Sequence, residues 1–199
     1  MNDIRGYVLA GGRSSRMGSD KALLQIEQHS AIERQCDLLE SSCPQGVFIA
    51  GATSKELHQL RWPVIQDATQ DQGPISGIIA ALQHAQDGIA VIIAVDLVAL
   101  ERSDIEKLTT ACSKDLNSQF DVFFAQNDRD LSEHGAQPLC AAWRADTSLS
   151  VLTQQFASNQ RSVMKSWLGL KRHGVSIPDS HLININSPLD FENFRQTKG

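Results

Sequence analysis

Short apolar runs alternate with amphipathic segments along most of this chain, and that alternation limits the folds open to it. Six runs have the length and composition of strands: Ile4–Leu9, Gly46–Ala50, Pro63–Ile65, Ile89–Val95, Phe120–Ala125 and Leu139–Trp143. Five segments carry apolar residues three or four apart, as helices do: Ala31–Leu39, Ser54–Leu60, Ile75–Ala85, Asp104–Ala111 and Ser148–Phe156. The pattern predicts an α/β fold, a three-layer α/β/α Rossmann-like domain with a mainly parallel, mixed sheet.

The size and charge of the chain agree with a compact enzyme. Its 199 residues predict a single domain over 1–199, and 41% hydrophobic with 21% charged residues is ordinary for a globular protein. The net charge is −5 and no block of Lys and Arg stands out, so nucleic acid is not an expected partner. No stretch approaches the ~18 apolar residues of a membrane span, so a membrane is not expected either.

The cysteines and histidines show no pattern of a metal site or a disulfide framework. Cys36, Cys43, Cys112 and Cys140 form no C-x-x-C pair, and nothing resembles a signal peptide. The six histidines lack the spacings of zinc ligands. We therefore expect reduced thiols and a cytoplasmic location.

A glycine-rich, basic turn follows the first predicted strand. It runs Leu9, Ala10, Gly11, Gly12, Arg13, Ser14, Ser15, Arg16, Met17, Gly18, Ser19, Asp20, Lys21. Glycines let the backbone approach a ligand closely, so that its N–H groups can face phosphate oxygens. Arg13, Arg16 and Lys21 add positive charge for the same anion. The turn is a candidate nucleotide site, although it matches neither the Walker A nor the three-glycine dinucleotide pattern; an ordinary turn with solvated basic residues is the alternative.

Two carboxylates follow later predicted strands. Asp67 precedes a Gly73–Pro74 turn that opens a helix, which places N–H groups and the positive pole of the helix near the carboxyl edge of the sheet. In open α/β sheets, ligands bind at that edge. Asp96 ends a buried strand and should face the same edge, where it is well placed to hold Mg²⁺ between nucleotide phosphates. The alternatives are a plain helix start with proline at its first position and a turn aspartate.

The second half of the chain offers weaker signals. Asn184 and Asn186 alternate with isoleucines, which puts both amides on one face of an extended segment, followed by a predicted helix over Asp190–Arg195. Asn, Ser and Pro are also common before any helix. The polar stretch Asn127–Gly135 is predicted to be a loop that overhangs a site.

Taken in order, these motifs resemble those of a known enzyme family. The run from Leu9 to Lys21 is similar to the L-A-G-G-x-S-x-R-M-G-x-D-K signature of nucleotidyltransferases with the nucleotide-diphospho-sugar transferase fold. Asp67–Gly77 resembles the D-x(n)-G-P-L-A-G segment of molybdenum cofactor guanylyltransferases, and Asp96 the aspartate of their C-D-M-P element. Gly135–Ala141 resembles their H-P-T or Q-P-L segment, and Leu182–Asp190 their F-x-N-x-N-T-P-E element. The chain is identified as a member of this molybdenum cofactor guanylyltransferase (MobA) family, with the Gly-Gly pair favouring the guanylyl over the cytidylyl branch.

The resemblance implies transfer of GMP from GTP to molybdenum-bound molybdopterin, with Mg²⁺ as cofactor and pyrophosphate as by-product. The catalytic residues that it implies are Arg16, Lys21 and Asp96, with Asp96 as the metal ligand. It assigns GTP binding to Leu9, Ala10, Gly11, Gly12, Lys21, Asp67, Gly73 and Asp96. It assigns the acceptor side to Gln137, Pro138, Asn184 and Asn186. It also implies transient contact with molybdenum-insertion proteins and molybdoenzyme chaperones.

The sequence departs from the family pattern in two places. Val95, Leu97 and Val98 surround Asp96 where the family has Cys, Met or Thr, and Pro, and Ala50 replaces an asparagine after the second strand. Two other functions therefore stay open: cytidylyl transfer to molybdopterin or another phosphorylated acceptor, and nucleotide binding by a module whose catalysis has decayed.

Overall fold

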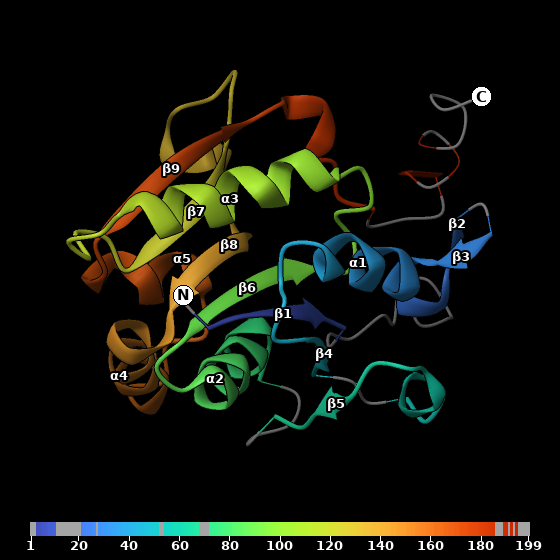
Figure 1. Ribbon diagram of the computed structural model, residues 1–199, viewed down its shortest axis with the longest axis horizontal. Coiled ribbons are helices and arrows are strands. Elements are labelled where there is room, and N and C mark those ends of the chain that lie inside the picture. The colour runs from blue at the N-terminus through green and yellow to red at the C-terminus, as the bar shows by residue number, and fades with distance from the viewer. Residues whose placement is uncertain are drawn as a thin grey trace.

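A seven-stranded sheet forms the centre of the molecule (Figure 1). The computed structural model describes residues 3–10, 21–26, 28–51, 54–67, 72–185, 189–190, 192 and 194. The strands of this sheet are β1 (Ile4–Leu9), β4 (Val47–Ala50), β5 (Val64–Ile65), β6 (Ile89–Ala94), β7 (Val122–Asn127), β8 (Ala136–Arg144) and β9 (Arg172–Ile177). Their order is β5-β4-β1-β6-β8-β7-β9, and β8 runs antiparallel to both neighbours while the other neighbouring pairs are parallel. The predicted mainly parallel, mixed sheet is confirmed.

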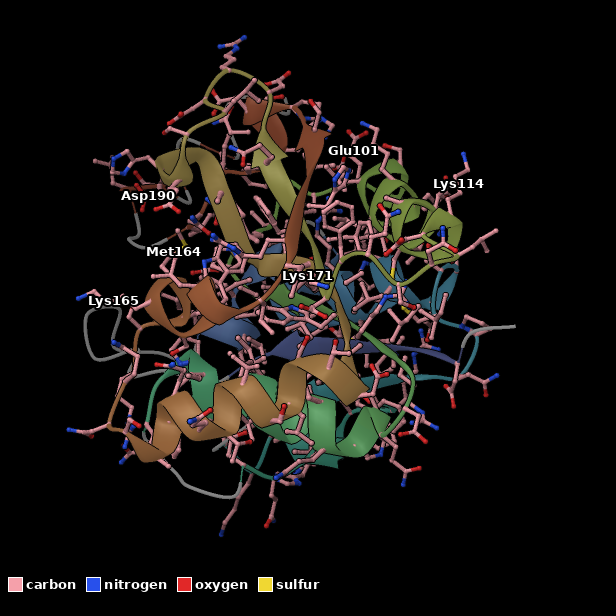
Figure 2. All side chains as sticks on the ribbon, turned by 90° about the vertical axis from the view of Figure 1, so that its left-hand side faces the viewer. Glu101, Lys114, Met164, Lys165, Lys171 and Asp190 are labelled. Carbon is pink, nitrogen blue, oxygen red and sulfur yellow. The ribbon has the colours of Figure 1, made fainter. Side chains whose placement is uncertain are left out.

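Helices cover both faces of the sheet. The helices are α1 (Ala31–Glu40), α2 (Pro74–Ala85), α3 (Arg102–Lys114), α4 (Ala145–Ala157) and the short α5 (Val163–Ser166). One hydrophobic core unites α1 and α3 with one face of the sheet, and a second unites α2, α4 and α5 with the other. Figure 2 shows α2 and α4 below the sheet and α3 above it, with Glu101 and Lys114 at the two ends of α3. These three layers confirm the predicted α/β/α arrangement.

Short elements fill the connections. A two-stranded hairpin is made of β2 (Gln25–Ile26) and β3 (His29–Ser30). The single 3₁₀ turns are η1 (Lys21–Leu23), η2 (Leu57–Gln59), η3 (Glu133–Gly135), η4 (Trp167–Gly169) and η5 (Asp179–His181).

Local chemistry explains the main elements. All six residues of β6 are buried, as expected of an apolar strand in the middle of a sheet that helices cover on both faces. At the start of α1, the Ser30 N–H donates to the Glu33 carboxylate at 2.8 Å and the two side chains are 2.6 Å apart, so the capping box satisfies donors that the first turn leaves unpaired. Pro74 begins α2, where its missing N–H costs nothing.

One expectation about local structure is wrong, and one strand was not predicted. The segment Ser54–Leu60 forms only the 3₁₀ turn η2, because its single fully buried apolar residue, Leu57, gives no helical stripe to pack. The edge strand β9 escaped the sequence analysis because its burial is slight and its residues are mostly polar. In the predicted alternation after β9, Ile183 is 44% exposed and Ile185 is buried, and the predicted shared face of Asn184 and Asn186 stays a prediction because Asn186 lies outside the described residues.

The predicted C-terminal helix is seen in part. Leu189, Asp190, Glu192 and Phe194 are helical, and the other residues of that segment lie outside the described part of the chain. Within the described residues, no helix has both the length and the apolar composition to cross a membrane. The division into one domain over 1–199 stays a prediction.

Candidate functional site

The carboxyl ends of four parallel strands meet at one edge of the sheet. In register, Leu9 of β1 lies beside Ala50 of β4 and Ala94 of β6. The pairing continues past the strand ends: the Ala10 N–H donates to the Ala50 carbonyl at 2.9 Å, and the Val95 N–H donates to the Leu9 carbonyl at 3.2 Å. The predicted nucleotide residues Leu9 and Ala10 are thus fixed next to the turn that carries Asp96.

The predicted acceptor residues of β8, Gln137 and Pro138, reach the same edge because this strand runs the opposite way. Cys140 pairs with Ile93 of β6, so Gln137 and Pro138, which precede it, extend beyond the end of β6. The register between β7 and β8 shifts at this point, where Gln137 pairs with Ala125 and Pro138 has no ladder partner. A proline cannot donate to a ladder, so an irregularity is expected there.

Asp67 lies against the start of α2, as the motif predicts. Its Oδ2 accepts a hydrogen bond from the Ser76 hydroxyl at 2.9 Å, while its buried Oδ1 has no partner among the described residues. Gly73, just before α2, has a φ of 80°, a conformation that favours glycine. A side chain at Gly77 would come within 3.0 Å of Leu9, so the helix starts close against β1. The unsatisfied carboxylate oxygen is a feature that a bound ligand would explain.

The ionisation of Asp67 reflects this burial. Desolvation raises the pKa of its carboxyl above the usual range, and the hydrogen bond from Ser76 opposes the shift. A carboxylate that is costly to ionise and that lacks one partner gains from a ligand that donates N–H or O–H groups to it.

Asp96 occupies the turn after β6. Burial raises the pKa of its carboxyl, and the positive charge of Lys21 acts in the opposite direction. The structure therefore brings together two residues that are 75 positions apart and that the sequence analysis put in one site. An ammonium group near a half-buried carboxylate provides both signs of charge that a metal–phosphate complex needs.

The unusual turn after Asp96 is held from α1. Gln35, fully buried, donates its amide to the Leu97 carbonyl at 2.6 Å, and the Arg34 Nε donates to the Val98 carbonyl at 2.9 Å. The Leu97 and Val98 side chains are buried in the core. The proline expected at position 98 is thus replaced by side-chain bonds that fix the same stretch of backbone.

The segment that carries Asn184 is tied to the Asp96 turn. The Ile185 N–H donates to the Asp96 carbonyl at 3.0 Å, so the half-buried Asn184 lies beside the turn that carries Asp96. Three residues earlier, His181 Nδ1 lies 2.9 Å from Oδ2 of Asp104, a fully buried carboxylate near the start of α3. The same oxygen accepts the N–H of Glu101, the N-cap of α3.

Some predicted residues cannot be placed. Gly11, Gly12, Arg16 and Asn186 lie outside the described residues. Of the other predicted residues, Leu9, Ala10, Lys21, Asp67, Gly73, Asp96, Gln137, Pro138 and Asn184 all lie at or beside this edge of the sheet.

A metal can be tested against the groups present. In the described part of the chain, no group of three or more His, Cys, Asp or Glu side chains is arranged to hold a metal ion. Mg²⁺ does not need such a cage, since it is usually held by one or two carboxylates together with substrate phosphates and water. The single hard-oxygen carboxylate of Asp96 fits that role.

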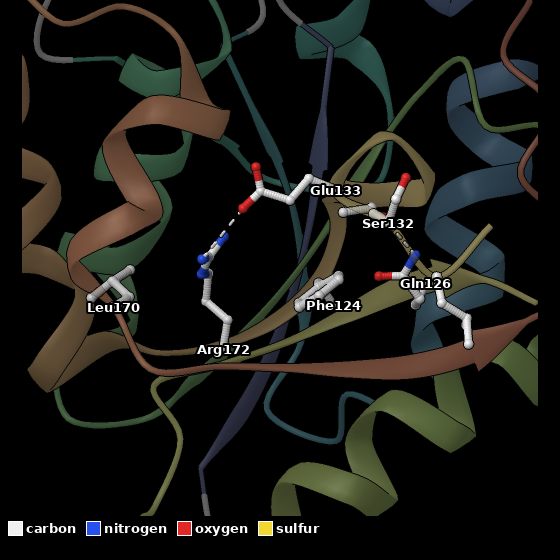
Figure 3. Close-up of a pocket in the computed structure, with 8 residues that line it drawn as sticks. Phe124, Gln126, Ser132, Glu133, Leu170 and Arg172 are labelled. Atoms are coloured by element: carbon white, nitrogen blue, oxygen red, sulfur yellow. Dashed lines mark hydrogen bonds and ion pairs between the residues drawn. The ribbon is translucent and has the colours of Figure 1, made fainter.

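The sequence analysis did not identify three residues that hold the surroundings of the site together: Arg161, His181 and Arg172. Arg161 donates its Nε to the Gln72 side chain at 2.9 Å and stacks over the Phe156 ring at 3.9 Å, which supports the loop before α2. His181 and Arg172 are the other two, and none of them belongs to a local motif. The predicted loop Asn127–Gly135 does overhang a hollow, which Arg172 and Glu133 line together (Figure 3).

Comparison with known proteins agrees with this geometry. A family model described as the MobA-like NTP transferase domain matches residues 6–173. A protein of Rhodopirellula baltica, named probable molybdenum cofactor guanylyltransferase, is 30% identical over 195 residues, covering 94% of this chain and 89% of the relative. A molybdenum cofactor guanylyltransferase of Xanthomonas euvesicatoria is 30% identical over 189 residues, covering 92% of this chain and 89% of the relative.

Solved structures share the fold. Molybdopterin-guanine dinucleotide biosynthesis protein A from Archaeoglobus fulgidus superposes with a TM-score of 0.78 at 21% identity, over 98% of both chains. A nucleotidyl transferase from Methanothermobacter gives a TM-score of 0.73 at 20% identity, over 99% of this chain and 98% of the other.

Proposed function

This chain belongs to the MobA-like NTP transferase family, and from that premise we propose that it transfers GMP from GTP to molybdenum-bound molybdopterin. The observation that carries the proposal is the meeting of Asp67, Lys21 and Asp96 at one edge of the sheet, next to the backbone of Leu9 and Ala10. Relatives named molybdenum cofactor guanylyltransferase support the choice of nucleotide and acceptor.

The nucleotide lies at the parallel side of this edge in our proposal. Leu9, Ala10, Gly11 and Gly12 contact guanosine and phosphates through backbone groups, and Gly73 lets the chain turn closely into α2. Oδ1 of Asp67, which has no hydrogen-bond partner in the described part of the chain, accepts a hydrogen bond from the nucleoside, which would satisfy its buried lone pairs.

Charge neutralisation is the main catalytic contribution. Lys21 and Arg16 offset the negative charge of the α-phosphate and of the departing pyrophosphate, and Asp96 holds Mg²⁺. When bound, Mg²⁺ would supply positive charge that stabilises the nucleotide phosphates. Because burial raises the pKa of Asp96, a nearby cation also stabilises its ionised form.

The acceptor approaches from the β8 side. Its terminal phosphate has a second pKa near ~6, so it is already an anionic nucleophile at neutral pH and needs no general base. An acceptor phosphate oxygen attacks the α-phosphorus as the bond to the β-phosphate oxygen breaks, and pyrophosphate leaves. Gln137, Pro138, Asn184 and Asn186 orient the acceptor, which is catalysis by positioning.

The setting of this reaction follows from its substrates. GTP and the molybdenum cofactor intermediate are the partners that the proposal requires, and a cytoplasmic location is part of it. Transient contact with molybdenum-insertion proteins and molybdoenzyme chaperones would deliver the acceptor and receive the product.

The test is product formation with two nucleotides. Purified protein is incubated with Mg²⁺, molybdenum-bound molybdopterin and either GTP or CTP, and the dinucleotide is quantified. We expect product with GTP alone. Product with CTP alone would assign the chain to cytidylyl transfer, and nucleotide binding without product from either would identify a decayed binding module. A parallel reaction without Mg²⁺ should yield no product.

A further inference from the structure

A hollow on the α4 side of the sheet is lined mostly by residues outside the motifs, with Ala136 as the one lining residue from Gly135–Ala141. It is a cavity of about 270 Å³ at the end of β7, and it is lined by Phe124, Gln126, Leu131, Ser132, Glu133, Ala136, Leu170 and Arg172 (Figure 3). Pockets for whole drug-sized ligands hold roughly 300–1,000 Å³. The cavity therefore suits one ring system of a larger ligand rather than the whole molecule.

The cavity adjoins the proposed acceptor residues along β8. Ala136 lines it, and the next residue along β8 is Gln137. Leu9 and Ile75 on the nucleotide side share one hydrophobic core with Leu170 beside the cavity, so both regions are on the face that α2 and α4 cover. Three strand spacings of about 4.8 Å separate β6 from β9, so a ligand with its phosphate near Asp96 can reach the cavity with its other end.

Two opposite charges face each other across the cavity. The Arg172 guanidinium lies 3.8 Å from the Glu133 carboxylate, and the Glu133 side chain is 70% exposed. An ion pair this long and this exposed contributes little to stability. Arg172 is held independently of this pair, since its guanidinium also lies 5.2 Å from the centre of the Trp167 ring. The two groups can therefore turn to a ligand at small cost.

The loop that carries Glu133 is held by hydrogen bonds from β7. Gln126 of β7 donates its side-chain amide to the carbonyls of Asp130 and Ser132, the latter at 3.1 Å. Leu131 is 77% exposed at the rim of the cavity. Phe124 and Leu170 supply apolar walls, so the cavity combines flat apolar surface with one acceptor group and one donor group.

We propose that this cavity binds the pterin ring of the acceptor, with Glu133 and Arg172 reading its 2-amino-4-oxopyrimidine edge. This inference rests on the proposed function. A carboxylate accepts two hydrogen bonds at once, from the ring N–H and the exocyclic amino group of such an edge. A guanidinium donates to the adjacent carbonyl and ring nitrogen through its planar fork. The planar ring lies against Phe124 and Leu170, where apolar contact and ring stacking favour it.

Guanine presents the same hydrogen-bonding edge, so the experiment must distinguish the pterin of the acceptor from the guanine of GTP. The probe is free pterin, 2-amino-4-oxopteridine, whose own fluorescence reports binding to the full-length protein. Its Kd is measured in the absence and in the presence of saturating GTP. If the cavity belongs to the acceptor, pterin binds equally well in both conditions. If GTP displaces pterin competitively, the cavity holds guanine and the proposal is overturned.

Variants test the two charged residues. Glu133→Gln, on an exposed loop, and Arg172→Met, which keeps the stem that packs near Trp167, should each weaken pterin binding about tenfold through loss of charge-assisted hydrogen bonds. The control is Arg129→Ala, because Arg129 is 82% exposed, pairs with Asp179 and does not line the cavity. Its pterin affinity should equal that of the unmodified protein. Pterin binding that neither Glu133→Gln nor Arg172→Met weakens would overturn the assignment.

Turnover separates this inference from the proposed function. With molybdenum-bound molybdopterin and GTP, Glu133→Gln should raise the KM for the acceptor and leave the KM for GTP unchanged. A protein that binds pterin in the manner described but forms no dinucleotide would refute the guanylyltransferase assignment and support the pterin cavity. Dinucleotide formation with an acceptor KM that both variants leave unchanged would support the guanylyltransferase assignment and refute the pterin cavity.

Discussion

In the parallel part of the sheet, from β5 to β6, the proposed ligand contacts are backbone N–H groups and single carboxylates just beyond strand ends. In the mixed part, from β8 to β9, they are side chains on loops and on an edge strand, such as Glu133 and Arg172. Backbone and strand-end positions are fixed by topology, whereas loop side chains can change without disturbing the sheet. We infer that the parallel part determines the reaction and the mixed part selects the acceptor.

Removal of the Asp96 charge is the most severe way to test the parallel part. Asp96→Asn should lower kcat about a thousandfold, because the proposed metal would lose its carboxylate ligand at the reacting phosphates. The measurement is dinucleotide formation at saturating substrates. The matched control is Asp87→Asn, an exposed aspartate outside the site, which should keep normal turnover. Near-normal kcat in Asp96→Asn would remove this residue from catalysis.

Loss of the Lys21 charge should have the next largest effect. Lys21→Ala should lower kcat about a hundredfold, or ~3 kcal/mol, as does the loss of one preorganised charge-stabilising donor in other enzymes. Because Lys21 lowers the pKa of Asp96, the same variant should shift the acidic limb of the pH–rate profile to higher pH. Lys114→Ala, at the far end of α3, is the control with the same change of charge (Figure 2).

A smaller effect is expected from the tie between His181 and Asp104. His181→Ala should raise the KM for the acceptor about tenfold, because the segment with Asn184 loses its side-chain contacts with Asp104 and Glu101. The KM for GTP should not change, and His181→Asn, whose amide can still donate to Asp104, should restore much of the loss. An equal rise in both KM values would indicate a general structural defect. His58→Ala, on η2 between β4 and β5, is the control.

The smallest effect concerns stability. Asp67→Asn should raise Tm by about 2–4 °C at pH 7, equivalent to about 1 kcal/mol, because the burial that raises the pKa of Asp67 makes its charged form costly. The cost exists only above the usual pKa of an aspartate, so the advantage of Asp67→Asn should vanish as the pH falls below that value. GTP should stabilise the variant less than the parent. Thermal unfolding with and without GTP measures both effects, and an unchanged gain at low pH would contradict the explanation.

The parallel part could be predicted from sequence to a large extent. β1 has the bounds that its apolar run predicts, and Asp67 and Asp96 lie at the edge where strand-end carboxylates were expected. These predictions succeed because the physical cause is local: a buried apolar strand followed by a polar turn. The pairing of Lys21 with Asp96 is not local. It was the family resemblance, and not the apolar periodicity, that put both residues in one site.

The mixed part was harder to predict for physical reasons. β9 is an edge strand in which only Ile177 is buried, so it lacks the apolar alternation that marks a strand. Glu133 and Arg172 are 39 positions apart and meet only because β9 pairs with β7. His181 and Asp104 are likewise joined by tertiary structure alone. No short motif could have indicated these pairs.

Two-substrate kinetics tests the division between the two parts of the sheet most directly. KM values for GTP and for molybdenum-bound molybdopterin are measured in the parent protein, in Asp67→Asn and in Arg172→Met. We predict that Asp67→Asn raises the KM for GTP and leaves the acceptor KM unchanged, and that Arg172→Met does the opposite. A rise in both KM values in both variants, or the reversed pattern, would contradict the account.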